Sequence, residues 1–293
     1  MEKAITILTP SYNRAYVLPQ LYNSLCRQTN QHFVWLIVDD GSNDGTGKLV
    51  DKWKGEGKIV IEYIYQVNGG KHRAHNTGVK SINTELIMIC DSDDYLMDDA
   101  VEKALRCWNT YKNENTSGVI AYRGQIINGI LQKSKNQEFI IKDIYSKVYK
   151  IFEVQQIVET TNIYRTDILK ENLFPEVEGE KFFPEMYLWM KIDANYDVII
   201  LREILQVYKY LEDGYTRSKK GPSWIGNCPV AFAMFFYLKF ELQNSFVKKI
   251  IEYGKCRGLF YLYRRKEIPR KNLWWDFVSF PVALMAMFKY KAK

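Results

Sequence analysis

The sequence has 293 residues, of which 47% are hydrophobic and 15% aromatic, and its net charge is +7. This composition supplies enough apolar surface for a globular core and excludes a disordered or fibrous chain. The five cysteines occur singly and never as a CxxC pair, which argues against a zinc site or a disulfide framework. They predict reduced, mostly buried thiols in a cytoplasmic protein.

The charge is unevenly distributed along the chain. Residues 1–215 hold 25 Lys and Arg against 30 Asp and Glu, whereas residues 216–293 hold 16 against 4, a net charge of +12. We therefore expect an acidic domain over 1–215 followed by a basic extension over 216–293. Such a basic segment suits an anionic surface, and a solvated basic helical face is the alternative.

Four apolar runs in the first hundred residues are separated by segments with helical spacing. The runs cover residues 4–8, 33–38, 59–65 and 85–90, and the helical spacing covers 17–28, 46–54 and 71–81. Unbroken apolar strands that alternate with helices predict a doubly wound α/β sheet of parallel strands covered on both faces. Residues 1–4 lead directly into the first run, so we expect no signal peptide.

The pattern changes after residue 118. We expect strands at 119–122, 160–164, 198–201 and 205–210, and helices at 167–171 and 184–194. Residues 123–158 have no clear pattern, and we interpret them as a variable region over the site. From Pro222 onward the predicted structure is helical, in segments 223–243, 246–263 and 271–293.

A polar cluster follows each predicted parallel strand, at residues 9–14, 39–40, 68–73 and 91–94. Ligands of such sheets bind beyond the carboxyl ends of the strands, so we expect the clusters to meet there. Asp91 and Asp93 are two residues apart and point the same way in an extended chain. They can share one divalent cation that bridges two phosphates, whereas the alternative is an acidic turn that caps the next helix.

The turn Asn68-Gly69-Gly70 precedes a predicted helix and can bring backbone N–H groups close to a phosphate. Lys71, His72 and Arg73 add positive charge where an anionic ligand would lie. We interpret His72 as a donor-site contact and His75 as structural. A simple turn followed by a helix start is the alternative for this motif.

Four motifs occur in order in the first 120 residues: TPSYNR (Thr9–Arg14), VDDGSNDGT (Val38–Thr46), NGGKHRAHNTG (Asn68–Gly78) and DSDD (Asp91–Asp94). Together they strongly resemble bacterial family 2 glycosyltransferases of the GT-A fold, such as capsular and exopolysaccharide enzymes. The resemblance implies a hexosyltransferase with a nucleotide-sugar donor, usually a UDP-sugar, and an inverting transfer assisted by Mn2+ or Mg2+. It implies a Rossmann-like GT-A domain over 1–215, with a nucleotide-sugar half at 1–120 and an acceptor half at 121–215, before the basic helical extension.

The resemblance also implies roles for single residues. Pro10, Tyr12 and Arg14 would border the base and ribose, Asp39 or Asp40 would accept hydrogen bonds from them, and Lys71 or Arg73 would approach the base or diphosphate. Asp91 would lie at the ribose and Asp93 would hold the metal. The implied donor set is Pro10, Tyr12, Arg14, Asp39, Asp40, Lys71, His72, Arg73, Asp91 and Ser92, and the implied metal ligands are Asp91 and Asp93.

An inverting transfer also needs a general base. The family usually places it at an acidic pair that opens a helix, and the segment Gly179–Trp189 is similar to that stretch, with Met186 in place of the second acid. The resemblance therefore implies Glu185 as the base. The alternatives are that Glu185 only caps the helix after Pro184 or that Glu178 or Glu180 serves as the base.

Residues 208–217 resemble the segment that closes the catalytic domain. The resemblance implies that Arg217, Lys219 and Lys220 fold over the diphosphate.

The C-terminal segment 271–289 is apolar but interrupted by Asp276 and Pro281, so its uninterrupted part is too short to span a bilayer. Trp274 and Trp275 beside basic residues suit a membrane interface. We expect peripheral attachment to the anionic inner face of the plasma membrane and a glycan or polyprenyl-diphosphate-linked acceptor. The alternative is a helical bundle that packs on the catalytic domain or forms a homodimer.

Three other classes of protein are alternatives to this interpretation. A nucleotidyltransferase would carry a Gly-rich basic loop directly after the first strand, and residues 9–13 lack one. A nucleic-acid-binding protein would use the basic tail, but Asp91–Asp94 would repel phosphate without a metal, so we expect no nucleic acid partner. A non-catalytic family member is the alternative that Met186 leaves open.

Overall fold

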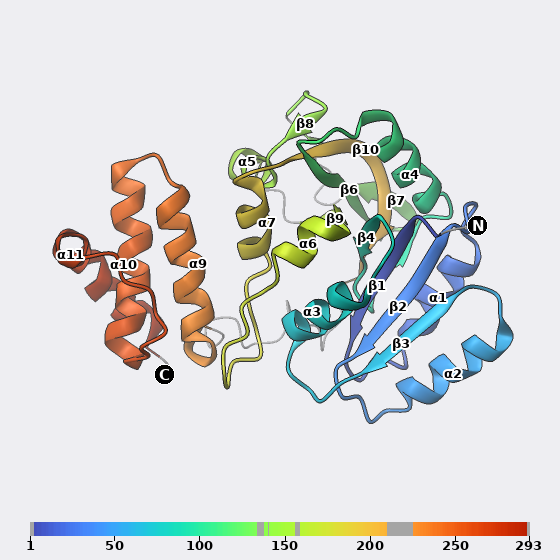
Figure 1. Ribbon diagram of the computed structural model, residues 1–293, viewed down its shortest axis with the longest axis horizontal. Coiled ribbons are helices and arrows are strands. Elements are labelled where there is room, and N and C mark those ends of the chain that lie inside the picture. Colours follow the sequence, from blue (N-terminus) through green and yellow to red (C-terminus); the bar gives the residue numbers. More distant parts are fainter. Residues whose placement is uncertain (1–2, 134–137, 140, 156–158, 210–224, 292–293) are drawn as a thin grey trace. The chain divides into compact units, whose positions relative to one another are not determined.

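The computed structural model describes residues 3–133, 138–139, 141–155, 159–209 and 225–291. The chain divides into two compact units, one of Met1–Leu173 with Asn195–Leu211 and one of Phe174–Ala194 with Glu212–Lys293 (Figure 1). Residues 174–194, which we expected within the first domain, thus cluster with the C-terminal helices. The expected domain boundary at 215/216 stays a prediction.

The first unit is built on one mixed sheet, in which the described residues form ten strands in the order β3-β2-β1-β4-β9-β6-β10-β5, with β7 paired to β6 and β8 to β10. The strands are β1 (Ile5–Ser11), β2 (Phe33–Asp39), β3 (Ile61–Tyr65), β4 (Leu86–Ile89), β5 (Tyr95–Leu96), β6 (Thr116–Ile127), β7 (Ile130–Lys133), β8 (Tyr145–Ser146), β9 (Thr160–Arg165) and β10 (Asp197–Val207). Strands β1 to β4 are mutually parallel where they pair, which confirms the predicted parallel half.

The helices of the first unit are α1 (Leu18–Cys26), α2 (Thr46–Glu56), α3 (Lys71–Ser81), α4 (Ala100–Tyr111), α5 (Val148–Gln155) and α6 (Thr166–Glu171). Ile5 and Ile7 of β1 lie in a core shared with α1, α2 and α4. Leu8, on the opposite face of the same strand, packs against α3 at Gly78. This alternation is the reason that both faces of β1 are buried, as the unbroken apolar run predicted.

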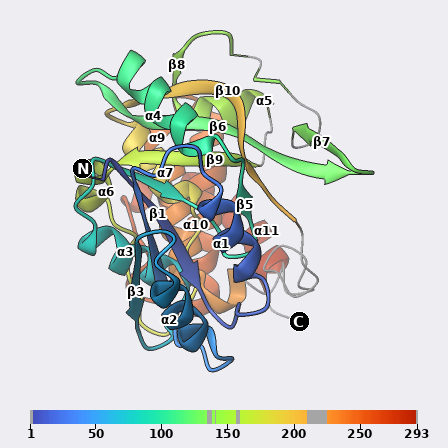
Figure 2. The ribbon, with the colours of Figure 1, turned by 90° about the vertical axis from the view of Figure 1, so that its right-hand side faces the viewer.

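The second half of the sheet is mixed, because β9 is antiparallel to both of its neighbours, β4 and β6. One expectation is corrected here. β10 is one strand where we expected two, because a shift in register between Leu201 and Ile204 accommodates the exposed Arg202 and Glu203 without ending the pairing with β6. Figure 2 shows the β6–β7 hairpin, from the region that we left unassigned, reaching away from the other strands.

The second unit contains α7 (Met186–Asp193) and the helices α9 (Pro229–Leu242), α10 (Phe246–Tyr263) and α11 (Leu273–Tyr290). The predicted helical C-terminal region is therefore confirmed. Ser245 and Asn272 cap α10 and α11 by accepting hydrogen bonds from the backbone N–H groups three residues onward. Among the described residues, no helix is both long enough and apolar enough to cross a membrane. The cysteines are free, four of them buried and Cys26 half-buried, as expected.

The packing of α3 on the sheet makes a testable prediction. A methyl group on Gly78 would lie 2.3 Å from Leu8 Cδ1, whereas one on Gly55 of α2 would meet nothing within 4 Å. Gly→Ala in a helix gains up to about 1 kcal/mol in helix propensity, and overpacking costs about 1–3 kcal/mol. In urea unfolding we expect Gly55→Ala to stabilise the protein and Gly78→Ala to destabilise it. Equal effects of the two substitutions would contradict this packing.

Candidate functional site

The four sequence motifs meet at the carboxyl ends of the parallel strands. Ser11 at the end of β1 lies beside Asp39 of β2, which in turn pairs with Tyr65 of β3. The Asn13 N–H donates to Ser42 Oγ at 2.8 Å, which joins the first motif to the second. Lys71 Nζ lies 2.6 Å from Asp91 Oδ1 and joins the third motif to the fourth. The expected convergence therefore exists within the first unit.

Asp40 organises the loop that contains the Gly-Gly turn. Its Oδ1 accepts hydrogen bonds from Gln66 Nε2 at 2.7 Å and from the Gly69 N–H at 2.8 Å. Its Oδ2 accepts from Asn68 Nδ2 at 3.0 Å and from the Gly70 N–H at 2.8 Å. A carboxylate offers about four acceptor positions, and all are used within the chain. Asp40 therefore positions this loop, and its contact with a donor stays a prediction.

Asp39 uses fewer of its acceptor positions. Its Oδ1 accepts from the Ser42 N–H at 2.7 Å, and its Oδ2 accepts from the Tyr63 hydroxyl at 2.6 Å. Burial and the bond to Asp39 raise the pKa of Tyr63, which keeps the hydroxyl protonated as a donor. Of the two adjacent aspartates, Asp39 is thus the one with acceptor capacity left for a base or ribose, and that role stays a prediction.

The remaining donor residues line the same edge. Pro10 is buried in β1, whereas the Tyr12 side chain is 48% exposed and presents an open ring face. Arg14 donates to the Tyr16 hydroxyl at 2.7 Å and lies over its ring. Ser92 is buried in the turn after β4. These positions agree with a donor pocket, and their contacts to a donor stay predictions.

The first residues of α3 lie beside the Gly-Gly turn. The Arg73 side chain packs so closely on Gly69 that a Cβ there would come within 2.7 Å of Arg73 Cδ. His72 and His75 are both buried in α3. Burial lowers the pKa of His75 to about 3, with a further contribution from the charge on Lys71. His75 is therefore a neutral core residue, in agreement with its structural interpretation.

Asp91 is compensated by protein cations. Besides Lys71, the Arg123 guanidinium lies 3.6 Å from Asp91 Oδ2. Burial alone would raise the pKa of Asp91, but Lys71 and Arg123 hold it below its ordinary value. Asp91 is thus held ionised by two protein cations, and its roles at the ribose and as a metal ligand stay predictions.

Asp93 has the opposite environment. Burial and the charge on Asp91 raise the pKa of Asp93, and within the described part of the chain no cation forms an ion pair with it. Mg2+ and similar ions bind through one or two carboxylates together with substrate phosphates, so a single uncompensated carboxylate fits such an ion. No group of three or more His, Cys, Asp or Glu that could hold a metal occurs among the described residues. The donor set therefore suits a cation that arrives with a diphosphate.

Arg123 is a central residue that sequence reasoning missed. It comes from β6, forms a close ion pair with the buried Asp94, and lies 3.0 Å from Glu159. Its guanidinium also lies over the Tyr208 ring, 5.5 Å from the centroid. Gln206 Nε2 donates to the same Asp94 carboxylate at 2.6 Å. No local signal marks Arg123, because its partners are scattered between residues 91 and 208.

The candidate general base belongs to the second unit. Glu185 is exposed and stands before the first turn of α7, but its side chain makes no capping hydrogen bond, so the side-chain cap that we considered is absent. Met186 opens the helix and is half-buried. Glu185 as the base stays a prediction.

Glu180 and Glu178, the alternative bases, have different surroundings. Glu180 is buried and accepts hydrogen bonds at 2.9 Å from the N–H groups of Val230 and Ala231, which anchors the start of α9. This structural role removes Glu180 from the candidates. Glu178 is exposed. Arg217, Lys219 and Lys220 lie outside the described residues.

Comparison with known families decides the class of the protein. The model of the family "Glycosyl transferase family 2" matches residues 6–173, which is more than half of the chain. The chain belongs to glycosyl transferase family 2. The matched residues include all four motifs and Arg123.

Named members of the family are similar over part of their length. The poly(ribitol-phosphate) beta-N-acetylglucosaminyltransferase TarS of Staphylococcus aureus is 26% identical over 191 residues, which cover 62% of this chain and 32% of TarS. The glycosyltransferase GlyA of Streptococcus pneumoniae is 25% identical over 224 residues, which cover 75% of this chain and 28% of GlyA. The chain thus spans about a third of the length of these curated relatives.

Solved structures share the fold. The crystal structure of S. aureus TarS 1–349 in complex with UDP-GlcNAc matches with a TM-score of 0.65 and 17% identity, covering 98% of this chain and 89% of that one. The mannosyltransferase PcManGT of Pyrobaculum calidifontis, in complex with GDP-Man and Mn2+, matches with a TM-score of 0.56 and 14% identity, covering 99% and 83%. These likenesses confirm the GT-A fold expected from the sequence.

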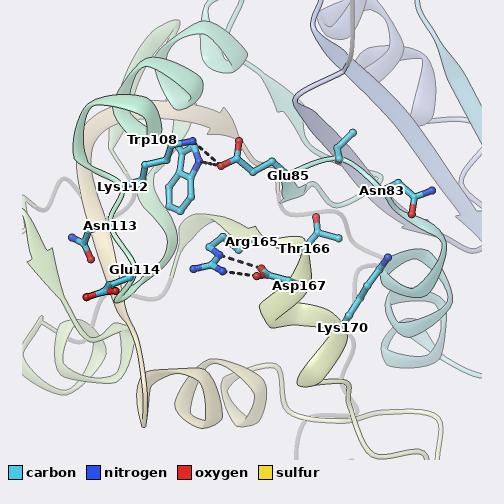
Figure 3. Close-up of a pocket in the computed structure, with 11 residues that line it drawn as sticks. Asn83, Glu85, Trp108, Lys112, Asn113, Glu114, Arg165, Thr166, Asp167 and Lys170 are labelled. Atoms are coloured by element: carbon cyan, nitrogen blue, oxygen red, sulfur yellow. Dashed lines mark hydrogen bonds and ion pairs between the residues drawn. The ribbon is translucent and has the colours of Figure 1, made fainter.

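A surface pocket of about 530 Å3 lies away from the family 2 motifs (Figure 3). Glu85 lines it at the amino end of β4, whereas Asp91 follows the carboxyl end of the same strand. Two ion pairs lie within its lining, Lys112 with Glu85 and Arg165 with Asp167, and the Trp108 indole donates a hydrogen bond to Glu85. This pocket therefore lies at the opposite edge of the sheet and does not belong to the candidate site.

The ion pair of Arg123 with the buried Asp94 predicts a large effect of removing the guanidinium. Arg123→Met would leave Asp94 buried with only Gln206, and breaking a buried pair costs about 3–5 kcal/mol. Arg165→Met, in the neighbouring β9, would break a pair whose Asp167 partner is mostly exposed, which costs at most about 1 kcal/mol. We expect urea unfolding to rank the variants in this order. Similar losses would mean that the Arg123 network contributes no more than a surface pair.

The buried His75 predicts a pH dependence of stability. Its pKa is about 3 in the folded chain and 6.5 as the ordinary value, so the unfolded chain binds the extra proton between these values. The contribution of neutral His75 to the free energy of unfolding has its full value above pH 6.5. It falls by about 1.4 kcal/mol per pH unit between pH 6.5 and about pH 3. We expect the unfolding free energy of His75→Gln to change less between pH 7 and pH 5 than that of the wild type. Identical changes would show that His75 is already protonated or exposed.

Proposed function

We propose that the protein is an inverting, metal-dependent glycosyltransferase. It transfers a sugar from a nucleotide-diphosphate donor, most simply a UDP-sugar, to a hydroxyl group of a glycan acceptor. Membership of family 2 supports the reaction class. A UDP-GlcNAc complex of TarS and a GDP-Man complex of PcManGT, both of this fold, support a nucleotide-sugar donor.

One observation carries the proposal, namely the arrangement of charge at the carboxyl edge of β1 to β4. There the protein compensates Asp91 with Lys71 and Arg123 but leaves Asp93 without a described cation. Asp93 is half-buried, so its negative charge is partly withdrawn from water without an ion pair, and a divalent ion bound to a diphosphate would compensate that charge. In this proposal Asp93 holds the ion and Asp91 contacts the ribose.

The chain's own residues then have separate tasks. Asp40 fixes the Gly69–Gly70 turn close to the edge, so that the start of α3 and its Lys71 face the donor. Asp39 accepts hydrogen bonds from the base or ribose, and Tyr12 offers a stacking face. A bound divalent cation would offset the negative charge that develops on the departing diphosphate.

The transfer itself needs one proton acceptor. Glu185 takes the proton from the acceptor hydroxyl group. The oxygen of that hydroxyl group attacks the anomeric carbon from the face opposite the diphosphate. The carbon–oxygen bond to the nucleoside diphosphate breaks, the diphosphate leaves with the electron pair, and the configuration inverts.

The acceptor in this proposal is a bacterial surface polysaccharide or a polyprenyl-diphosphate-linked glycan under assembly, as in capsule biosynthesis. The relatives named as poly(ribitol-phosphate) glycosyltransferases, from S. aureus and Bacillus spizizenii, support a polymeric acceptor. A lipid-linked acceptor places the enzyme at the inner face of the plasma membrane, as a peripheral cytoplasmic protein.

Hydrolysis and binding of UDP-, GDP- and dTDP-sugars, with Mn2+ or with a chelator, test the proposal. We expect Asp93→Asn to lose metal-dependent donor binding. We expect Glu185→Gln to keep donor binding and to lose about 100-fold or more in turnover, the usual effect of removing a general base. Glu178→Gln, at a similarly exposed glutamate, is the matched control and should behave as the wild type.

Three results would contradict the proposal. Failure to bind any nucleotide sugar would reject the donor assignment. Full turnover by Glu185→Gln together with a loss in Glu178→Gln would move the base to Glu178. An enzyme that binds the donor but transfers nothing even as the wild type would indicate a non-catalytic family member.

A further inference from the structure

Helix α11 has its large apolar side chains on the outside. Leu273, Phe277, Met285 and Phe288 are exposed to 74%, 81%, 63% and 84%. With Trp274, Phe280 and Leu284 they form one continuous stripe, spaced three, four and seven residues apart, which we call the α11 apolar face. The stripe extends over the whole helix.

The inner face of α11 is made of small residues. Ser279, Ala283 and Ala286 are its buried positions, and they face Gly254 and Gly258 of α10. A Cβ on Gly258 would come within 2.7 Å of Ala286 Cβ, so the two helices touch backbone to backbone. This arrangement is the reverse of a helix on a water-soluble surface, which turns its large apolar residues inward. The outer face therefore suits contact with an apolar partner.

The charge around this face identifies the class of partner. Residues 225–291 hold 12 Lys and Arg against 4 Asp and Glu. Each of the four acids, Glu241, Glu252, Glu267 and Asp276, is already in an ion pair with a Lys or Arg of the same helical region. Arg270 and Lys271 precede α11, and Lys289 and Lys291 lie at its end. A second copy of the chain would bring the same positive charge, so it is the less suitable partner.

We propose that the α11 apolar face docks on an anionic lipid bilayer, with α11 lying in the plane of the membrane. Large apolar and aromatic side chains then enter the boundary between headgroups and acyl chains, and the excess of basic residues attracts anionic lipids. Asp276 keeps the first turn of α11 bound to the protein, through Arg257 at 3.0 Å and Arg270 at 2.7 Å. This ion-paired turn favours a surface position over insertion of the helix end.

The surface extends onto the start of α10. Phe246 and Val247 are exposed there, and the Phe246 ring lies 6.1 Å from that of Trp274. Lys248 and Lys249 follow directly in the sequence. The docking surface thus combines a long apolar stripe with basic residues near both of its ends. The inference depends on the proposed function in one respect, namely that membrane docking would give the enzyme access to a lipid-linked acceptor.

Co-sedimentation of the full chain with vesicles tests this inference. We expect binding to phosphatidylglycerol-containing vesicles, little binding to pure phosphatidylcholine, and weakening when NaCl is raised from about 0.05 to 0.5 M. Phe277→Ser with Phe288→Ser should weaken binding by about tenfold or more, because two large apolar groups no longer leave water. Ile127→Ser with Ile130→Ser removes two exposed apolar side chains from the β6–β7 hairpin and should change nothing.

Other outcomes would overturn the inference. These are absence of vesicle binding, equal binding by the Phe277/Phe288 double variant, or equal loss in the hairpin control. A dimer in sedimentation that the Phe277/Phe288 substitutions dissociate, without vesicle binding, would assign the face to a second copy. Donor hydrolysis in solution, measured on the same preparations, separates failure of this inference from failure of the proposed function, because the vesicle assay contains no nucleotide sugar.

Discussion

The cost of holding negative charge away from bulk water governs how the carboxyl edge of this sheet is built. Five carboxylates follow β2 and β4, namely Asp39, Asp40, Asp91, Asp93 and Asp94. Asp40 is satisfied by backbone N–H groups and amides, which in return shape the Gly-Gly turn. Asp94 and Asp91 are satisfied by cations that come from other elements. Asp93 differs from these residues, because no described cation pairs with it. This difference is the reason that we propose Asp93 as the residue that holds a metal ion.

The same charges connect parts of the chain that are remote in sequence. Arg123 from β6 and Gln206 from β10 both contact Asp94, so the second half of the sheet holds the acidic motif that follows the first. The two halves that we expected at 1–120 and 121–215 are therefore electrostatically dependent on each other. Asp91, held ionised by Lys71 and Arg123, is part of this charge network, and its role as a metal ligand stays a prediction.

The second unit follows a different principle. Its helices approach closely through small residues, and the apolar residues that a soluble bundle would bury are turned outward on α11. Glu180, in contrast, is buried so that it can satisfy the first N–H groups of α9. Glu180 thus differs from its acidic neighbours Glu178 and Glu185, which are exposed.

The sequence by itself determined the parallel first half of the sheet, the convergence of four motifs at its carboxyl edge, the helical basic tail and the family. These features depend on local patterns, since an unbroken apolar run followed by polar residues specifies both a buried strand and the end at which a ligand binds. Only the tertiary structure decided which aspartate was compensated. Asp94 accepts a hydrogen bond from Gln206, which is 112 residues away in the sequence. It also pairs with Arg123, which lies in the region 123–158 where the sequence shows no clear pattern. No local sequence pattern predicts such contacts. The outward face of α11 was also decided by the tertiary structure. The segment is apolar on most sides of the helix, and which side packs on α10 depends on the close approach at Gly254 and Gly258.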